Sequence, residues 1–254
     1  MGVSPPLLIA DLGRPERFLH MMRVVKPSSP MNMGVWILTG AGLTTGLATV
    51  RNVLGWFPRL GRAGSVGAAL IGPPLTTYTG VLLADTAVPA WHEARRELPW
   101  LFAASAAASA GALGAATTPT AWASPARRLA VAGALAETAA ATVMERRLGP
   151  LLSEPYREGP AGQLARASRG LNILGAGLLV AAGSPSPSRA TRRAAAVAGG
   201  AMVLGAAACT RMAVFKAGLE SARDPKYTVV PQRRRLEQGR GHRQHEQVQR
   251  IRSA

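Results

Sequence analysis

The sequence predicts an all-α fold, a polytopic transmembrane helix bundle of about six spans. Hydrophobic residues make up 48% of the 254 residues and charged residues only 17%. The charges cluster between long uncharged runs, which is typical of a multi-span membrane protein. Alanine and glycine supply much of the apolar content, and such small side chains let membrane helices approach closely. We expect the bundle domain over residues 1–217 and a disordered, basic C-terminal tail over residues 218–254.

The net charge of +17 is the second strong feature of the composition. In a soluble protein such a charge indicates nucleic-acid binding. Here the positive-inside rule explains it, so we expect a lipid bilayer and no nucleic acid as partner. The single cysteine, Cys209, lies in an apolar run and cannot form an internal disulfide or hold a metal cluster alone. Any metal or Fe–S centre would therefore belong to a partner, and no metal or haem is expected in this chain.

The first segment that we can assign is polar and basic, over residues 11–33, DLGRPERFLHMMRVVKPSSPMNM. Within this segment, Pro15 suits the first turn of a helix. Apolar side chains then recur at helical spacing among basic ones: Phe18, Leu19, Met22 and Val25. This pattern is typical of a short amphipathic helix at a membrane surface. His20 on this helix is a candidate for proton transfer, although a solvated residue is the simpler interpretation.

Six apolar runs follow as candidate spans, with Ser29 and Pro30 as cap and first residue of the first helix. We expect the spans at residues 33–50, 64–88, 98–118, 126–144, 170–183 and 194–214. The second span contains Pro73-Pro74, which should kink it. The third is almost all Ala, Ser and Gly, so it should lie inside the bundle. Residues 145–169 should form a charged loop.

Ionisable residues inside spans are candidates for function because a charge in the bilayer is costly. Glu137 lies in the middle of the fourth span. It is either a proton carrier that is neutral part of the time, or a structural partner for a buried arginine or hydroxyl. Asp85, near the end of the second span, is either a proton-transfer group or a boundary residue. Arg211, late in the last span, can snorkel to the surface.

The orientation follows from the basic residues, since alternate loops lie on opposite sides of the membrane. Basic residues are more numerous on the side that holds residues 11–33 and the tail. The positive-inside rule therefore predicts a multi-pass protein of the plasma (inner) membrane with a cytoplasmic C-terminus.

Three segments resemble the NrfD/polysulfide reductase (PsrC-like) membrane-subunit family. Residues 7–38, LLIADLGRPERFLHMMRVVKPSSPMNMGVWIL, are similar to its DLGRP-x-RF motif and the Ser-Pro-Met entry into a helix. The other two segments are YTGVLLADTAVPAW at residues 78–91 and FKAGLESARDPKYTVVPQRRR at residues 215–235. Asp11, Arg14 and Pro15 match the motif, with a structural role as the simpler interpretation. In the family two helices precede this motif, so the resemblance implies that the chain lacks them.

The resemblance implies a non-catalytic membrane subunit of an oxidoreductase complex. Such a subunit has no redox centre, binds quinone or menaquinone, and passes electrons to or from a peripheral ferredoxin-like Fe–S subunit. A molybdopterin-type catalytic subunit often lies beyond. A family tyrosine on the second-span helix lines the quinone pocket, which corresponds to Tyr78, and a phenol supplies a donor without a charge. A core aromatic residue is the alternative.

The sequence leaves two other functions open. The chain could be a passive membrane anchor or a truncated remnant without a quinone site, because the family's pocket also uses its first helix. A small-solute transporter would need broken helices in two related halves, and the sequence shows one Pro-Pro break.

Overall fold

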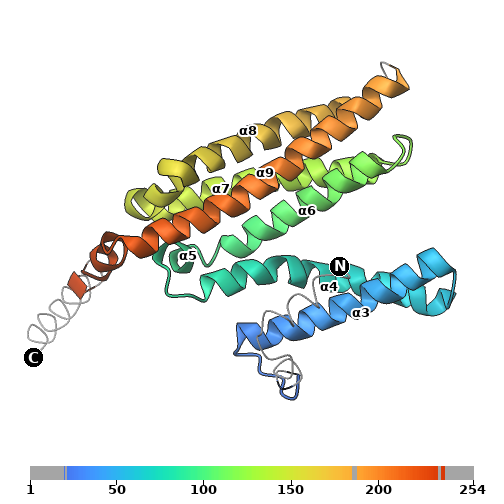
Figure 1. The fold of residues 1–254 in the computed structure, drawn as a ribbon. Coiled ribbons are helices and arrows are strands. Elements are labelled where there is room, and N and C mark those ends of the chain that lie inside the picture. Colours follow the sequence, from blue (N-terminus) through green and yellow to red (C-terminus); the bar gives the residue numbers. More distant parts are fainter. Residues whose placement is uncertain (1–19, 21, 185–187, 234–235, 238–254) are drawn as a thin grey trace, which may run out of the picture.

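The computed structural model describes residues 20, 22–184, 188–233 and 236–237. Every regular element in these residues is helical, which confirms the all-α prediction (Figure 1). The labelled helices are α3 Pro30–Leu54, α4 Pro58–Ala84, α5 Pro89–Glu93, α6 Leu98–Thr117, α7 Ser124–Arg157, α8 Gly159–Ala181 and α9 Arg189–Arg223. Residues 226–233 are also helical. The bundle therefore extends past residue 217, since α9 continues to Arg223.

Four long helices, α6 to α9, form a bundle, and α3 and α4 form a hairpin beside it (Figure 1). The hairpin packs on the bundle through contacts between α4 and α6, and α3 packs mainly on α4. We call the end with the α3–α4, α6–α7 and α8–α9 connections the turn end. We call the opposite end, which holds α5 and the end of α9, the α5 end.

The start of α3 follows the predicted cap. The Ser29 hydroxyl accepts a hydrogen bond from the Asn32 backbone N–H at 3.4 Å, and Pro30 is the first helical residue. The expected surface helix does not reach Val25, because residues 22–29 form turns and extended chain. The Asn32 side chain holds this segment through Lys26 N–H at 2.8 Å and the Val24 carbonyl at 2.9 Å. Asp11, Arg14 and Pro15 lie outside the described residues.

Helix α4 runs as one helix through Pro73 and Pro74. The Thr76 hydroxyl donates to the Pro73 carbonyl at 2.9 Å, and the Thr77 hydroxyl donates to the Pro74 carbonyl at 3.0 Å. The two threonine side chains thus bond to the carbonyl groups of the proline pair itself. In membrane helices, Ser and Thr side chains commonly satisfy backbone groups near a proline.

The prediction of a charged loop over residues 145–169 is wrong, because most of this segment belongs to α7 and α8. The chain breaks at Gly149, whose φ of 71° suits glycine, and Pro150 then opens a second helical segment. Burial of Leu148 and Tyr156 anchors the segment to the core. The sequence analysis did not predict these helices, because a segment rich in proline and arginine is typical of a loop.

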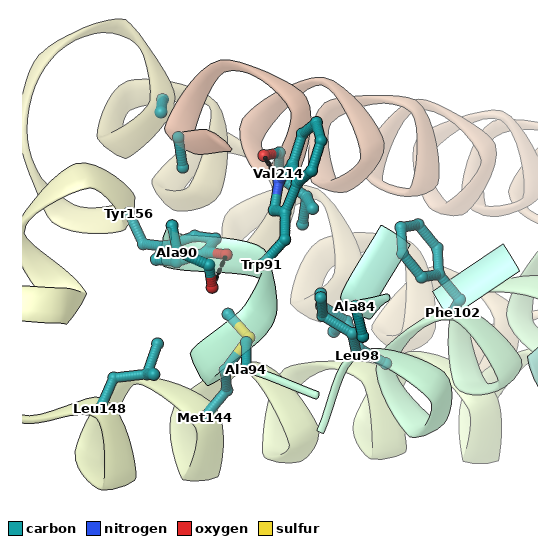
Figure 2. Close-up of a cluster of buried hydrophobic side chains, with 13 residues drawn as sticks. Ala84, Ala90, Trp91, Ala94, Leu98, Phe102, Met144, Leu148, Tyr156 and Val214 are labelled. Carbon is teal, nitrogen blue, oxygen red and sulfur yellow. Dashed lines mark hydrogen bonds between the residues drawn. The ribbon is translucent and has the colours of Figure 1, made fainter. Parts of the chain in front are cut away.

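A hydrophobic core at the α5 end fixes the short helix α5 (Figure 2). The Trp91 indole N–H donates to the Val214 carbonyl at 2.8 Å, and the Tyr156 hydroxyl donates to the Ala90 carbonyl at 3.1 Å. Burial raises the pKa of Tyr156, so its hydroxyl remains a donor. Gly218 makes room for the indole, since a Cβ there would lie 2.0 Å from the Trp91 ring. Trp91 itself is buried.

Four described helices are long and apolar enough to cross a membrane: α3, α4, α6 and α9. The sequence predicts six spans. The other two long helices, α7 and α8, are not apolar enough to be counted among the candidate spans. Helix α7 carries Glu137 and a run of charges near Glu145, and α8 carries Arg166 and Arg169. The prediction that the third span lies inside the molecule is confirmed, because α6 packs against α4, α7 and α9.

Candidate functional site

A small cavity with several polar side chains in its wall lies between α6, α7, α8 and α9. Its volume is about 30 Å³, enough for about two water molecules. Leu101, Met144 and Val214 form apolar parts of its wall. The polar side chains that line it are Glu137, Thr138 and Glu145 from α7, Ser168, Arg169 and Asn172 from α8, and Thr210 from α9.

Helical periodicity explains why these side chains meet in one place. Residues three, four, seven or eight apart lie on one face of a helix. Glu137, Ala141 and Glu145 follow this spacing on α7, and Ala165, Ser168, Arg169 and Asn172 follow it on α8. Each helix therefore presents one polar stripe to the same space.

Glu137 is the most unusual group in the cavity. It is 1% exposed, and neither carboxylate oxygen has a hydrogen-bond partner among the described residues. Asn172 Oδ1 and Arg169 Nε are likewise buried without a partner. Buried polar groups are normally hydrogen-bonded, so this absence of a partner is unusual. Among the described residues, neither an arginine nor a hydroxyl group is hydrogen-bonded to Glu137.

An ion pair closes the cavity at the α5 end. Glu145 is 7% exposed and pairs with Arg169, and its second oxygen accepts from Arg157 Nε at 3.4 Å. Beyond this pair lies a surface pocket of about 270 Å³ that shares Glu145, Tyr156 and Arg169 with the cavity. The Glu145–Arg169 pair thus lines both the surface pocket and the cavity.

Two hydroxyls of the cavity wall contact each other. Ser168 Oγ and Thr210 Oγ1 are 2.6 Å apart and both are buried. Ser168 precedes Asn172 by one helical turn on α8, so the hydroxyl pair and the amide follow one another along the cavity. These polar groups line the same cavity as Glu137 and Glu145.

Toward the turn end, the described residues close the cavity with apolar packing. A buried cluster fills the bundle there: Ala108, Ala112, Ala115, Ala130, Ala134, Ala176, Leu179 and Val203. The backbones approach closely, since a Cβ at Gly133 would lie 2.4 Å from the Ala108 nitrogen. At the α5 end, by contrast, the cavity shares lining residues with the surface pocket that contains Glu145 and Arg169.

Tyr78 lies elsewhere, in the α3–α4 hairpin. Its ring packs directly on Gly34, where a Cβ would lie 1.9 Å from Tyr78 Cζ. Trp36, two residues further along α3, has a buried indole nitrogen without a partner. The hairpin thus places the Tyr78 phenol between α3 and α4.

The other ionisable residues that the sequence suggested as functional do not line the cavity. Asp85 is exposed at the C-cap of α4, and His20 is exposed before α3. Arg211 is exposed on α9, where it donates to Ser105 Oγ at 3.0 Å and lies 6.0 Å from the Phe102 ring centre. In the described part of the chain, no three His, Cys, Asp or Glu side chains gather as a metal site would require.

Sequence reasoning missed most of the cavity. Glu145, Ser168 and Arg169 fell in the expected loop, and Asn172 and Thr210 fell in spans as unremarked polar residues. The spacing of Ser168, Arg169 and Asn172 on one helical face, together with Glu137 and Glu145, was the available signal.

Comparison with known proteins gives one match. A family model described as polysulfide reductase, NrfD_2, matches residues 3–223, which include all of the labelled helices. No curated protein and no solved structure gives a match.

Proposed function

The chain belongs to the NrfD/polysulfide reductase family of oxidoreductase membrane subunits, and we propose that it binds a quinone or menaquinone in the bilayer. In this proposal it passes electrons to or from a peripheral ferredoxin-like Fe–S subunit, beyond which a molybdopterin-type subunit performs the substrate chemistry. The chain itself supplies the quinone environment and the proton route.

The observation that supports this function best is the buried carboxyl of Glu137. Reduction of a quinone to a quinol takes up a proton for each electron, and oxidation releases them. A membrane subunit therefore needs groups that carry protons through a region without bulk water. Glu137 is such a group, because its carboxyl has no structural partner among the described residues and faces a polar cavity.

Protons reach Glu137 from the α5 end in this proposal. Glu145 lies eight residues after Glu137 on α7, about 12 Å along the helix axis. In this proposal the Ser168–Thr210 pair and Asn172, which line the same cavity, relay the proton, and transient opening of the Glu145–Arg169 pair admits it. The positive-inside rule puts this end, with the C-terminus, in the cytoplasm.

Tyr78 is the proposed quinone donor. Its hydroxyl can donate to one quinone carbonyl, and the apolar hairpin around it suits the ring and the isoprenoid tail. Tyr78 lies two turns before the end of α4, which leads to α5. The quinone donor and the mouth of the cavity therefore belong to the same half of the molecule.

Purification of the tagged native chain in mild detergent tests the assignment to an electron-transfer complex. The expected product contains an Fe–S protein, visible by its brown colour, and extractable quinone. A colourless chain that is recovered alone, without quinone, would contradict the proposal and favour a passive membrane anchor.

The variant Glu137→Gln tests the proton carrier in that purified complex. An amide of the same shape cannot carry a proton, so quinol-dependent electron transfer should fall by about 100-fold, the lower range for loss of a general acid or base. Glu220→Gln, an exposed position on α9, is the matched control and should leave the rate unchanged. A wild-type rate for Glu137→Gln would exclude Glu137 from the route.

A further inference from the structure

A groove at the turn end lies between the start of α7 and the end of α8. Its volume is about 650 Å³. Arg127 and Arg128 line its outer part, and Val131, Leu135 and Val180 line the part that extends toward the middle of the molecule. Leu135 is 60% exposed and Val180 61% exposed, so the apolar part is open to the surroundings.

No carboxylate of the described residues balances the charge of this groove. The sequence contains no Asp or Glu between Glu97 and Glu137, or between Glu158 and Glu220. The two turns that join α6 to α7 and α8 to α9 fall within these acid-free stretches. The ion pairs that the structure shows involve other basic residues: Arg147, Arg157, Arg169 and Lys226.

The two arginines are presented differently. Arg127 is partly buried, and its guanidinium donates to the Thr120 carbonyl at 3.1 Å. That bond holds the Arg127 side chain at the head of the groove. Arg128 is exposed beside it. Both arginines line the groove without a carboxylate, and phosphate oxygens accept guanidinium donors well.

The position of the groove relative to the bilayer follows from exposed aromatic residues. Trp122 is 80% exposed in the α6–α7 turn, and Trp56 is 62% exposed in the α3–α4 turn. Exposed tryptophans at the ends of membrane helices mark the level of the lipid headgroups. Arg128 follows Trp122 by six residues, and Leu135 lies about 10 Å deeper along α7. The arginines therefore lie at headgroup level and the apolar groove at acyl-chain level.

We infer that this groove binds an acidic phospholipid such as phosphatidylglycerol. The lipid phosphate lies between Arg127 and Arg128, and one acyl chain follows Val131, Leu135 and Val180. Basic pockets between membrane helices bind anionic headgroups in this way. The inference is independent of the proposed quinone chemistry, because it rests on the opposite end of the bundle.

The test uses the full chain purified in detergent and titrated with dioleoyl phosphatidylglycerol or dioleoyl phosphatidylcholine. Lipid adducts are measured by native mass spectrometry and stability by thermal unfolding. Phosphatidylglycerol should bind at least about tenfold more tightly and raise the melting temperature more. Arg128→Gln should weaken its binding about tenfold, as expected for loss of a charge-assisted contact.

Arg62→Gln is the matched control, since Arg62 is exposed at the same end of the molecule on α4, outside the groove. It should retain the preference for phosphatidylglycerol. Equal binding of the two lipids, or equal losses in the two variants, would overturn the inference in favour of a diffuse charge effect. Competition by inorganic phosphate alone, at concentrations near those of the lipid, would assign the site to a free anion instead.

Discussion

Glu137 combines two properties that rarely occur together, full burial and a carboxyl without a partner among the described residues. Buried acids are normally paired, because an unpaired charge is costly in a medium of low polarity. Its position in an apolar run made it a candidate from the sequence. Its surroundings were not predictable, because Asn172 and Thr210 come from helices whose relative rotation the sequence does not specify.

Tyr78→Phe tests the proposed quinone donor. Loss of the hydroxyl removes one hydrogen bond, so quinone binding should weaken by about 0.5–1.5 kcal/mol. Binding is measured by quinone titration of the purified complex. Tyr156→Phe makes the same chemical change at the Ala90 contact and should lower stability while leaving quinone affinity unchanged. Unchanged affinity in Tyr78→Phe would remove Tyr78 from the site.

At the scale of elements, glycines determine how closely the helices pack. Gly175 of α8 faces α9, where a Cβ would lie 2.9 Å from the Gly199 carbonyl oxygen. Gly177, on the same helix, has open space at that position. The two glycines differ in packing alone, so they form a matched pair.

Gly175→Ala should destabilise the protein by about 1–3 kcal/mol, because the new methyl group forces α8 and α9 apart. Gly177→Ala should be neutral or stabilise it by about 0.5–1 kcal/mol through better helix propensity. Unfolding of both variants in detergent micelles measures the difference. Equal effects would show that close α8–α9 packing does not limit stability.

Most long elements were predictable because their apolar runs are continuous. The start of α3 was predictable in detail, since Ser29 and Pro30 carry the chemistry of a cap. The segment from Glu145 to Arg169 was not, because its helices depend on tertiary contacts of Glu145 and Tyr156. Helix α5 was missed for the same reason, since Trp91 is held by bonds to distant residues.

At the scale of the whole molecule, the two ends differ in chemistry. The α5 end carries paired acids and bases and the mouth of the polar cavity, and the turn end carries arginines without acids. This difference suits a protein that exchanges protons on one side and contacts acidic lipid on the other. Both proposals depend on the orientation of the chain in the membrane.

Cysteine labelling tests that orientation. In a Cys209→Ala background, which removes the single cysteine, Ser184→Cys should react with a membrane-impermeant maleimide in intact cells. Gln232→Cys should react only after lysis, because we place the α5 end in the cytoplasm. The opposite labelling pattern would reverse the topology and place the mouth of the cavity outside the cytoplasm.

The most direct measurement is infrared spectroscopy of the purified chain during exchange of H₂O for D₂O. A protonated carboxyl group has a carbonyl band separate from that of a carboxylate, and the band shifts when its proton exchanges. We expect such a band in the wild type, its shift in D₂O, and its loss in Glu137→Gln. A spectrum without this band, or an identical band in Glu137→Gln, would contradict the role of Glu137 as the proton carrier of this bundle.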